Sequence, residues 1–262
     1  MHTEPLRRYG DAPYRLAVVH GGPGAAGSLG PLAKDLSEHC GVLEPLQSGL
    51  SIDAQVAELA DCLRAQATEP VILLGHSWGA WLALITAARH PQLVAKLILV
   101  GSGPFEEHYA TGMMDTRLGR LTPQQQKEAR RCMEQLGQGG AEPEPGTLAR
   151  FGELMHISDS YAPLPDTGSK VRVQMNIYRS IWPEAAALRR SGELLSMAEL
   201  IRCPVLAIHG DYDPHPAAGV QEPLQTRVKD FRFVLLSGCG HEPWAERQAR
   251  QEFFRVIVQG LA

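Results

Sequence analysis

Residues 71–89 read VILLGHSWGAWLALITAAR, and this stretch decides the fold. A short apolar strand is expected over 71–74 and a helix rich in Ala and Leu over 78–89. The intervening Gly75-His76-Ser77-Trp78-Gly79 fits G-x-S-x-G at a strand-to-helix turn, which is the context that the motif requires. The turn is so sharp that side chains at the glycine positions would collide, and the serine is strained. Because the Ser77 hydroxyl then lies at a helix N-terminus, where the dipole favours developing negative charge, Ser77 is predicted to be a nucleophile.

Strand-like and helix-like segments alternate on both sides of this motif. Strands are expected over 15–20, 40–43, 96–100, 205–209 and 231–236, and helices over 28–39, 52–66 and 242–258. Apolar residues recur at helical spacing over 52–66, and Ser51 is the expected N-cap of that helix. This alternation favours an α/β fold, with a mostly parallel sheet and helices on both faces.

The alternation stops between about residues 104 and 196. This stretch is more polar, and helical signals remain over 122–136 and 184–195. The Gly/Pro/Glu run GQGGAEPEPG over 137–146 predicts a loop. We interpret 104–196 as a helical insertion into a single α/β domain, so that residues 1–103 and 197–262 form the catalytic core.

A serine hydroxyl needs a base to take its proton, and the base needs an acid to orient it. His241 follows the strand expected over 231–236, and Asp213 follows the strand expected over 205–209. Ser77, Asp213 and His241 would therefore meet at the carboxyl edge of a parallel sheet, where such folds place their sites. The chain order Ser, Asp, His is also that of a known triad. The sequence predicts a Ser77-His241-Asp213 triad, with Asp211 as an alternative acid.

Several stretches together resemble the α/β-hydrolase superfamily over nearly the whole chain outside 104–196. They are HGGPG (20–24), GHSWGA (75–80), LILVGSGP (97–104), CPVLAIHGDYDPHP (203–216) and GHEPWAE (240–246). The resemblance implies the α/β-hydrolase fold, with Ser77 as nucleophile, Asp213 as acid and His241 as base. It also implies a cofactor-free enzyme in which 104–196 forms a lid over the triad.

An oxyanion hole needs two preorganised backbone N–H donors. By the resemblance, Gly22 and Trp78 supply them, with Gly21 as the less favoured choice for the first donor. His20 is expected to hold the glycine loop through hydrogen bonds. Four side chains of 104–196 are expected to line the substrate pocket, although each could instead pack the lid on the core: Tyr109, Tyr178, Trp182 and Glu184.

HGGPG together with a serine followed by Trp-Gly also resembles the proline iminopeptidases, which remove an N-terminal residue from small peptides. Such enzymes use acidic lid residues to bind the substrate ammonium, and Glu106, Glu107 and Glu184 are available for this role. The motif departs from the GGSWG usual in those peptidases, and the chain is short for them. Cleavage of an ester, a thioester or an amide through an acyl-enzyme is the leading prediction, and aminopeptidase activity is the alternative.

Two further interpretations are weaker. Residues 22–27 (GPGAAG) fit G-x-G-x-x-G, and Glu44 follows at the distance of a ribose-binding acid, which is typical of NAD(P)-binding oxidoreductases. That pattern does not account for the three downstream motifs. A ligand-binding receptor on a hydrolase scaffold usually has a damaged triad, whereas all three members are present here.

Composition sets the remaining expectations. Lys and Arg number 25 against 29 Asp and Glu, a net charge of -4, so neither a nucleic acid nor a membrane is an expected partner. The first residues lack a signal-peptide pattern, and the five scattered cysteines give no disulfide framework or metal pair. We expect a cytoplasmic enzyme that acts on a small molecule or a short peptide without a metal.

Overall fold

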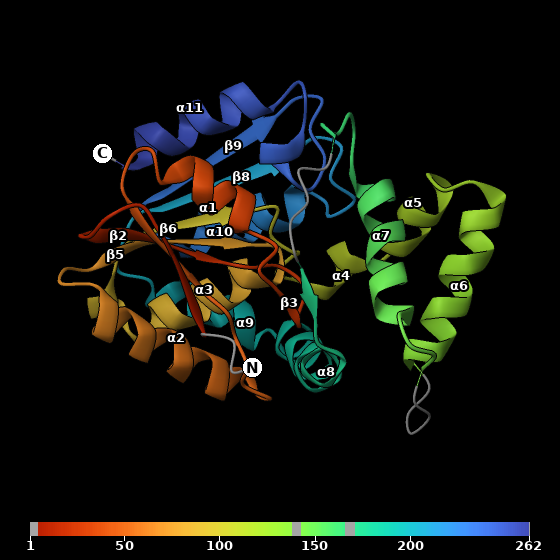
Figure 1. Cartoon of the computed structure of the whole chain (residues 1–262), viewed down its shortest axis with the longest axis horizontal. Helices are drawn as coiled ribbons and strands as arrows, with labels where there is room; N and C mark the ends of the chain where they lie inside the picture. The colour runs from red at the N-terminus through yellow and green to blue at the C-terminus, as the bar shows by residue number, and fades with distance from the viewer. Residues whose placement is uncertain (1–4, 138–142, 166–170, 262) are drawn as a thin grey trace.

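A seven-stranded sheet forms the centre of the chain in the computed structural model, which describes residues 5–137, 143–165 and 171–261 (Figure 1). The strand order is β1-β4-β2-β5-β6-β8-β9, and every neighbouring pair is parallel except β1 with β4. The sheet is therefore mostly parallel, as predicted. The strands are β1 (Leu6–Tyr9), β2 (Tyr14–Val19), β4 (Gly41–Pro45), β5 (Val71–His76), β6 (Val94–Val100), β8 (Val205–Gly210) and β9 (Phe231–Leu236).

Helices cover both faces of the sheet, because successive side chains of each buried strand point to opposite faces. Leu16 and Val18 of β2 face α1 (Gly30–Leu36) and α11 (Arg250–Leu261). Ala17 and Val19 belong to the larger cluster on the other face. That cluster contains buried residues of α2 (Ile52–Gln66), α3 (Trp78–Arg89) and α10 (Ala218–Arg227).

Most of the expected elements around the serine motif are confirmed. The helices α2 and α3 and the strand β9 have the expected bounds, and the Ser51 hydroxyl caps α2 by accepting the N–H of Ala54 at 3.1 Å. The expected helix over 242–258 is wrong at its start. Glu246 is extended (φ -90°, ψ 123°) and bridges to Pro163, so only a short 3-10 turn, Pro243–Ala245, precedes α11. The helix α10 was not predicted, and it contains Pro223, a residue that usually breaks helices.

The 104–196 segment contains more helices than expected. The signal over 122–136 corresponds to α6 (Pro123–Gly137), and the one over 184–195 corresponds to two helices, α8 (Met175–Ser191) and α9 (Glu193–Met197). They separate at Gly192, whose φ of 79° ends the helix. Three helices were not predicted: α4 (Glu107–Ala110), α5 (Met113–Gly119) and α7 (Thr147–Asp159). The loop expected over 137–146 lies partly outside the described residues.

This segment has two parts that pack differently (Figure 1). The first, which we call the α5–α7 group, projects beside the sheet and has a small buried cluster of its own: Leu118, Leu121, Ala129 and Leu154. The second, the α8–α9 pair, contributes Ile177, Ile181 and Leu194 to the main cluster beside α3. A two-residue strand, β7 (Arg172–Val173), precedes α8 and pairs with β3 (Ala25–Ala26), just after the glycine loop.

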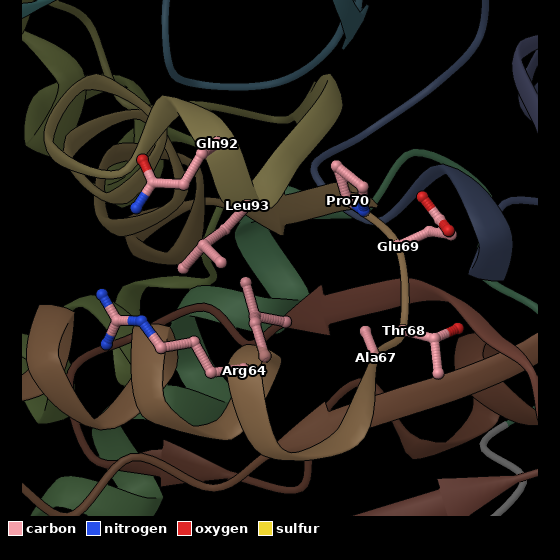
Figure 2. A pocket seen from close by; sticks show the side chains of 8 residues that line it. Arg64, Ala67, Thr68, Glu69, Pro70, Gln92 and Leu93 are labelled. Carbon is pink, nitrogen blue, oxygen red and sulfur yellow. The ribbon is translucent and has the colours of Figure 1, made fainter.

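The amino edge of the sheet carries an open depression of about 250 Å³ (Figure 2). It lies between the end of α2 and the starts of β5 and β6, and Arg64, Glu69 and Gln92 are among its lining residues. The predicted triad residues follow the carboxyl ends of the strands, so this depression is at the opposite edge. Among the described helices, none is long and apolar enough to cross a membrane.

Candidate active site

Ser77 occupies the sharp turn between β5 and α3. Its backbone has φ 55° and ψ -118°, and it is the one described residue other than glycine with a positive φ. A Cβ at Gly75 would come within 2.2 Å of the Gly79 carbonyl oxygen, and one at Gly79 within 2.2 Å of that of Val19. Neither position can therefore hold a side chain, because the backbone of another residue lies too close. The strain and crowding expected of the motif are present.

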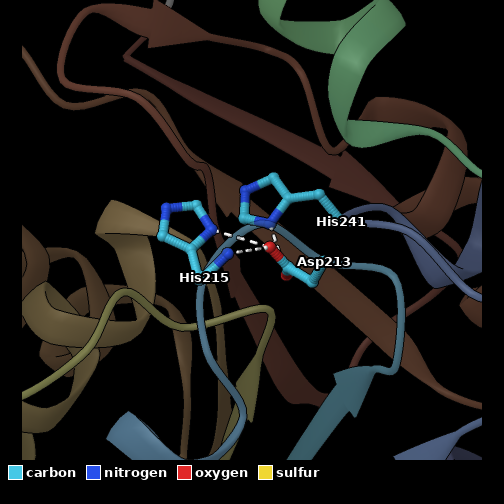
Figure 3. Close-up of side chains that lie close together, drawn as sticks. All are labelled: Asp213, His215 and His241. Carbon is cyan, nitrogen blue, oxygen red and sulfur yellow. Dashed lines mark hydrogen bonds and ion pairs between the residues drawn. The ribbon is translucent and has the colours of Figure 1, made fainter. Parts of the chain in front are cut away.

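Asp213 and His241 form a hydrogen-bonded pair at the same edge of the sheet. Asp213 follows β8 and His241 follows β9, and His241 Nδ1 lies 2.7 Å from Asp213 Oδ2 (Figure 3). Burial opposes ionisation of Asp213, but attraction to His241 and His215 outweighs it and holds the pKa of Asp213 well below its usual value. Burial opposes protonation of His241, but the attraction of the Asp213 carboxylate outweighs it, so the pKa of His241 lies above its usual value. The pair can therefore hold a proton on His241 beside an ionised carboxylate.

Two contacts join the His241 loop to the serine turn. His76, the residue before Ser77, has its Nε2 3.0 Å from the His241 carbonyl oxygen, and the two imidazole rings lie 4.6 Å apart. Burial keeps the pKa of His76 well below its usual value, so its ring is neutral and donates to that carbonyl. These contacts place the loop of His241 beside the turn that carries Ser77.

The glycine loop after β2 passes against the serine. A Cβ at Gly21 would lie 3.0 Å from Ser77 Cβ, and Gly22 follows with φ 52°. His20 Nδ1 lies 3.0 Å from the Gly21 carbonyl oxygen, and burial lowers the pKa of His20 to about 4. Trp78 begins α3, and its indole is buried in the main core. The backbone N–H groups of Gly22 and Trp78 thus both belong to segments that adjoin Ser77.

Residues 16–256 match the alpha/beta hydrolase family. The chain belongs to this family. The fold and the hydrolase class expected from the motifs are confirmed.

The relatives of this alpha/beta hydrolase include esterases and a peptidase. It is 26% identical to the pimeloyl-[acyl-carrier protein] methyl ester esterase of Neisseria meningitidis over 213 residues, which are 78% of this chain and 75% of the esterase. It is 22% identical to the proline iminopeptidase of Thermoplasma volcanium over 94% of this chain and 88% of the peptidase. The crystal structure of the monoacylglycerol lipase of Paleococcus ferrophilus has the same fold, with a TM-score of 0.63, 18% identity, and coverage of 98% and 97% of the two chains.

Of the four residues expected to line a substrate pocket, three lie on α8 and Tyr109 lies on α4 in this hydrolase. Tyr178, half-buried on α8, lies near Gly24, and Trp182 on the same helix is 41% exposed. The Tyr109 hydroxyl donates a hydrogen bond to Glu222 of α10. The Glu184 carboxylate accepts the N–H of Ile52, the first residue of α2, at 2.9 Å. Their role in substrate binding stays a prediction.

The alternative acids have other partners. Asp211 accepts hydrogen bonds from the Cys239 N–H at 3.1 Å and the Ser237 hydroxyl at 3.0 Å, so it supports the loop before His241. Glu44, the acid of the dinucleotide interpretation, is fully buried on β4 and accepts from the Tyr9 hydroxyl at 2.7 Å. Since the chain is an alpha/beta hydrolase, the NAD(P) alternative is set aside.

Sequence reasoning missed three side chains beside the pair. Two of them, Arg117 of α5 and Asp159 of α7, form a bidentate ion pair with its shortest contact at 2.6 Å, and the Asp159 carbonyl accepts the His241 N–H at 2.9 Å. The third, His215, contacts Asp213 directly. Its position two residues after the expected acid Asp213 is the sequence signal that could have identified it. No local pattern links Arg117 to Asp159 across 42 residues.

Asp213, His215 and His241 offer donor atoms that lie within 4.8 Å of one another, which is the spacing of a metal site. Each imidazole Nδ1, however, already meets a carboxylate oxygen of Asp213. The Arg117 guanidinium also lies 3.5 Å from His215 Nε2, and its positive charge opposes a cation there. These residues fit an acid–base cluster better than a metal centre.

Proposed function

We propose that this chain is a serine hydrolase that cleaves a small carboxylic ester through an acyl-enzyme, with Ser77, His241 and Asp213 as its triad. The observation that carries the proposal is the His241–Asp213 hydrogen bond of 2.7 Å beside a strained serine turn. An ionised acid, a base that it orients and a partly exposed nucleophile are the parts that acyl transfer requires. A thioester or an amide would react by the same steps.

In the proposed reaction, Ser77 Oγ attacks the ester carbonyl carbon while His241 Nε2 takes the hydroxyl proton. The N–H groups of Gly22 and Trp78 stabilise the oxyanion of the tetrahedral intermediate. The bond to the alcohol breaks as His241 returns the proton to the leaving oxygen. Water then attacks the acyl-enzyme, His241 takes its proton, and the acid leaves as Ser77 recovers its hydrogen. Asp213 orients the imidazole and stabilises its charged form throughout.

We also propose that the 104–196 segment is a lid that encloses the substrate. Two of the loops that carry proposed catalytic groups contact it, the glycine loop and the loop of His241. Gln174, just before α8, donates its N–H to the Gly24 carbonyl at 2.8 Å, and the Asp159 carbonyl accepts the N–H of His241. A segment in these positions can exclude water from the acyl-enzyme and shape the pocket.

An ester is favoured over a peptide because two of the three acidic side chains expected to bind a substrate ammonium, those of Glu107 and Glu184, are already engaged. An aminopeptidase needs a free carboxylate for the substrate ammonium. The Glu184 carboxylate caps α2, and that of Glu107 pairs with Arg189 at 2.7 Å. The similarity to methyl ester esterases points the same way. The likeness to proline iminopeptidases keeps aminopeptidase activity as the second candidate.

The test compares wild type with Ser77→Ala, His241→Ala and a control, Ser37→Ala, which removes a hydroxyl that bonds only to the Lys34 carbonyl in the described contacts. We expect hydrolysis of short p-nitrophenyl esters to fall by roughly a thousandfold or more in the first two variants and to persist in the control. A fluorophosphonate should label wild type and Ser37→Ala but not Ser77→Ala. Unimpaired turnover in Ser77→Ala would overturn the triad.

Substrate class is tested separately, on a panel of acyl esters, acyl thioesters and aminoacyl β-naphthylamides that includes proline. We expect the largest kcat/KM on an ester. A clear preference for N-terminal aminoacyl amides, lost in Ser77→Ala, would keep the triad but replace esterase activity with aminopeptidase activity.

A further inference from the structure

A second imidazole holds the carboxylate of the proposed catalytic acid. Figure 3 shows the Asp213 carboxylate beside the rings of both His215 and His241. Oδ1 meets His215, and Oδ2 meets His241. His215 Nδ1 lies 2.8 Å from Oδ1, and the His215 backbone N–H donates to the same oxygen at 2.9 Å. The rings of His215 and His241 lie 4.7 Å apart. The Asp213 side chain is fully buried, so these contacts take the place of water.

The contacts of His215 determine where its single proton lies. Burial lowers the pKa of His215 to about 4 despite the attraction of Asp213, so the ring is neutral near pH 7. An ionised carboxylate can only accept, so Nδ1 must carry the hydrogen that Asp213 receives. Nε2 then has a lone pair, and Arg117 Nη2 lies 3.5 Å from it. A guanidinium can only donate, so Arg117 favours this tautomer.

The other charged or titratable groups around the cluster support the same arrangement. His209 Nε2 lies 2.8 Å from the His215 carbonyl oxygen and 3.5 Å from Asp213 Oδ2. The Asp159 carboxylate holds Arg117 in place from α7, and His76 packs against His241 from β5. The backbone and both ring nitrogens of His215 are therefore all engaged.

We propose that His215 is a positioning residue for the triad, in a tautomer that Asp213 fixes and Arg117 of the α5–α7 group favours. The proposal rests on the triad proposed above. His215 keeps Asp213 in the rotamer that directs Oδ2 at His241. Its hydrogen bond also withdraws negative charge from the carboxylate, so that Asp213 stabilises the His241 imidazolium less strongly. The base then loses its proton nearer to neutral pH, where it must be unprotonated to act.

The experiment uses three substitutions of one side chain. The amide nitrogen in His215→Asn lies near the position of Nδ1 and can still donate to Asp213. The amide in His215→Gln lies near the position of Nε2, and His215→Leu has no donor. We expect kcat on a p-nitrophenyl ester to fall about 10- to 100-fold in His215→Leu, with little change in KM, because a small displacement of a catalytic group costs this much. His215→Asn should recover most of the loss and His215→Gln little of it.

The pH profile separates positioning from a general loss of structure. Removing the donor leaves more negative charge on Asp213, so the pKa of His241 should rise and the acid limb of kcat/KM should move to higher pH in His215→Leu. An acid limb that stays in place or moves to lower pH contradicts the proposal. The proposal is also contradicted if His215→Asn and His215→Leu lose the same amount of kcat and if that loss follows their loss of melting temperature.

A spectroscopic readout keeps this result distinct from a failure of the triad. The low-field proton resonance of the His241–Asp213 hydrogen bond can be recorded in Ser77→Ala, which needs no turnover. We expect this resonance to shift in Ser77→Ala/His215→Leu and to return towards its original position in Ser77→Ala/His215→Asn. Loss of activity in Ser77→Ala with no response to any His215 substitution would leave the triad standing and overturn the role of His215.

Discussion

The α8–α9 pair and the α5–α7 group belong to one stretch of chain, yet they are held to the sheet in different ways. The pair buries Ile177 and Ile181 in the main apolar cluster, and the strand before it pairs with β3. The group has only a small apolar cluster, and polar contacts join it to the core: the Asp159 carbonyl accepts the His241 N–H at 2.9 Å, and Arg117 Nη2 lies 3.5 Å from His215 Nε2. Arg120, for example, lies 3.6 Å over the ring of Tyr212 in the loop after β8.

The two kinds of attachment serve different halves of the candidate site. The α8–α9 pair contacts the glycine loop that carries Gly22. The α5–α7 group contacts the loop that carries His241, through the Asp159 carbonyl. Apolar burial is non-directional and tolerates small shifts. The contacts of the α5–α7 group instead depend on the Arg117–Asp159 ion pair inside it, and a buried ion pair is costly when one partner is lost. We therefore expect substitutions in the α5–α7 group to have larger effects than substitutions in the α8–α9 pair.

Asp159→Leu should cause the largest loss of unfolding free energy. It leaves the Arg117 guanidinium, whose side chain is 14% exposed, without its partner. Breaking a buried pair on one side costs about 3–5 kcal/mol. The double variant Arg117→Met/Asp159→Leu removes both charges and should recover much of that loss. Urea unfolding measures both free energies, and a double variant as unstable as the single one would show that the ion pair is not the cause.

The same ion pair predicts a dependence of stability on pH. Burial opposes ionisation of Asp159, but attraction to Arg117 outweighs it and lowers the pKa of Asp159 below its usual value. Its stabilising contribution is thus complete above the unfolded pKa, about 4, and is lost as the pH falls through the folded pKa. The difference in unfolding free energy between wild type and Asp159→Asn should shrink below about pH 4. A constant difference from pH 7 to pH 3 would contradict this.

Ile181→Ala and Leu154→Ala form a matched pair that tests the apolar side of the comparison. Both residues are fully buried, one in the main cluster beside α3 and one in the small cluster of the α5–α7 group. Ile181→Ala should cost about 3 kcal/mol of global stability. Leu154→Ala should mainly accelerate hydrogen exchange within α5–α7, because a small cluster opens locally. Faster exchange in β5 or α3 of Leu154→Ala would mean that the two parts unfold together.

This contrast explains what could be predicted from the sequence. The serine turn and α3 follow from a local apolar pattern, and Asp213 and His241 follow from their places after buried strands. Each of these signals lies within one element. The Arg117–Asp159 pair and the contact between Glu184 and Ile52 join distant parts of the chain, and an isolated charged residue usually indicates a solvated surface.

The loop after β9 is a second place where a local sequence pattern did not predict the structure. The Glu246 carboxylate is buried and accepts the backbone N–H groups of Gly240, Tyr161 and Ala162 at 2.7–3.0 Å. Glutamate is a good helix former, so the sequence predicted a helix through this position. These three N–H groups instead keep Glu246 extended, because the carboxylate that they share is buried and its hydrogen bonds would be lost in a continuous helix. Tertiary hydrogen bonds of this kind have no local pattern.

Substitution of Glu184 should cause the smallest loss of unfolding free energy. It tests whether the α8–α9 pair stabilises the fold or binds substrate. Its carboxylate accepts the Ile52 N–H at 2.9 Å, so α8 supplies an anion to the N-terminus of α2. Glu184→Ala should lower the unfolding free energy by about 1 kcal/mol, as the loss of a capping acceptor does, and Glu184→Gln by less because an acceptor oxygen remains. Ester hydrolysis should be unchanged in both variants. Loss of aminoacyl β-naphthylamide hydrolysis in both, with no change in stability, would instead mean that this carboxylate binds a substrate ammonium.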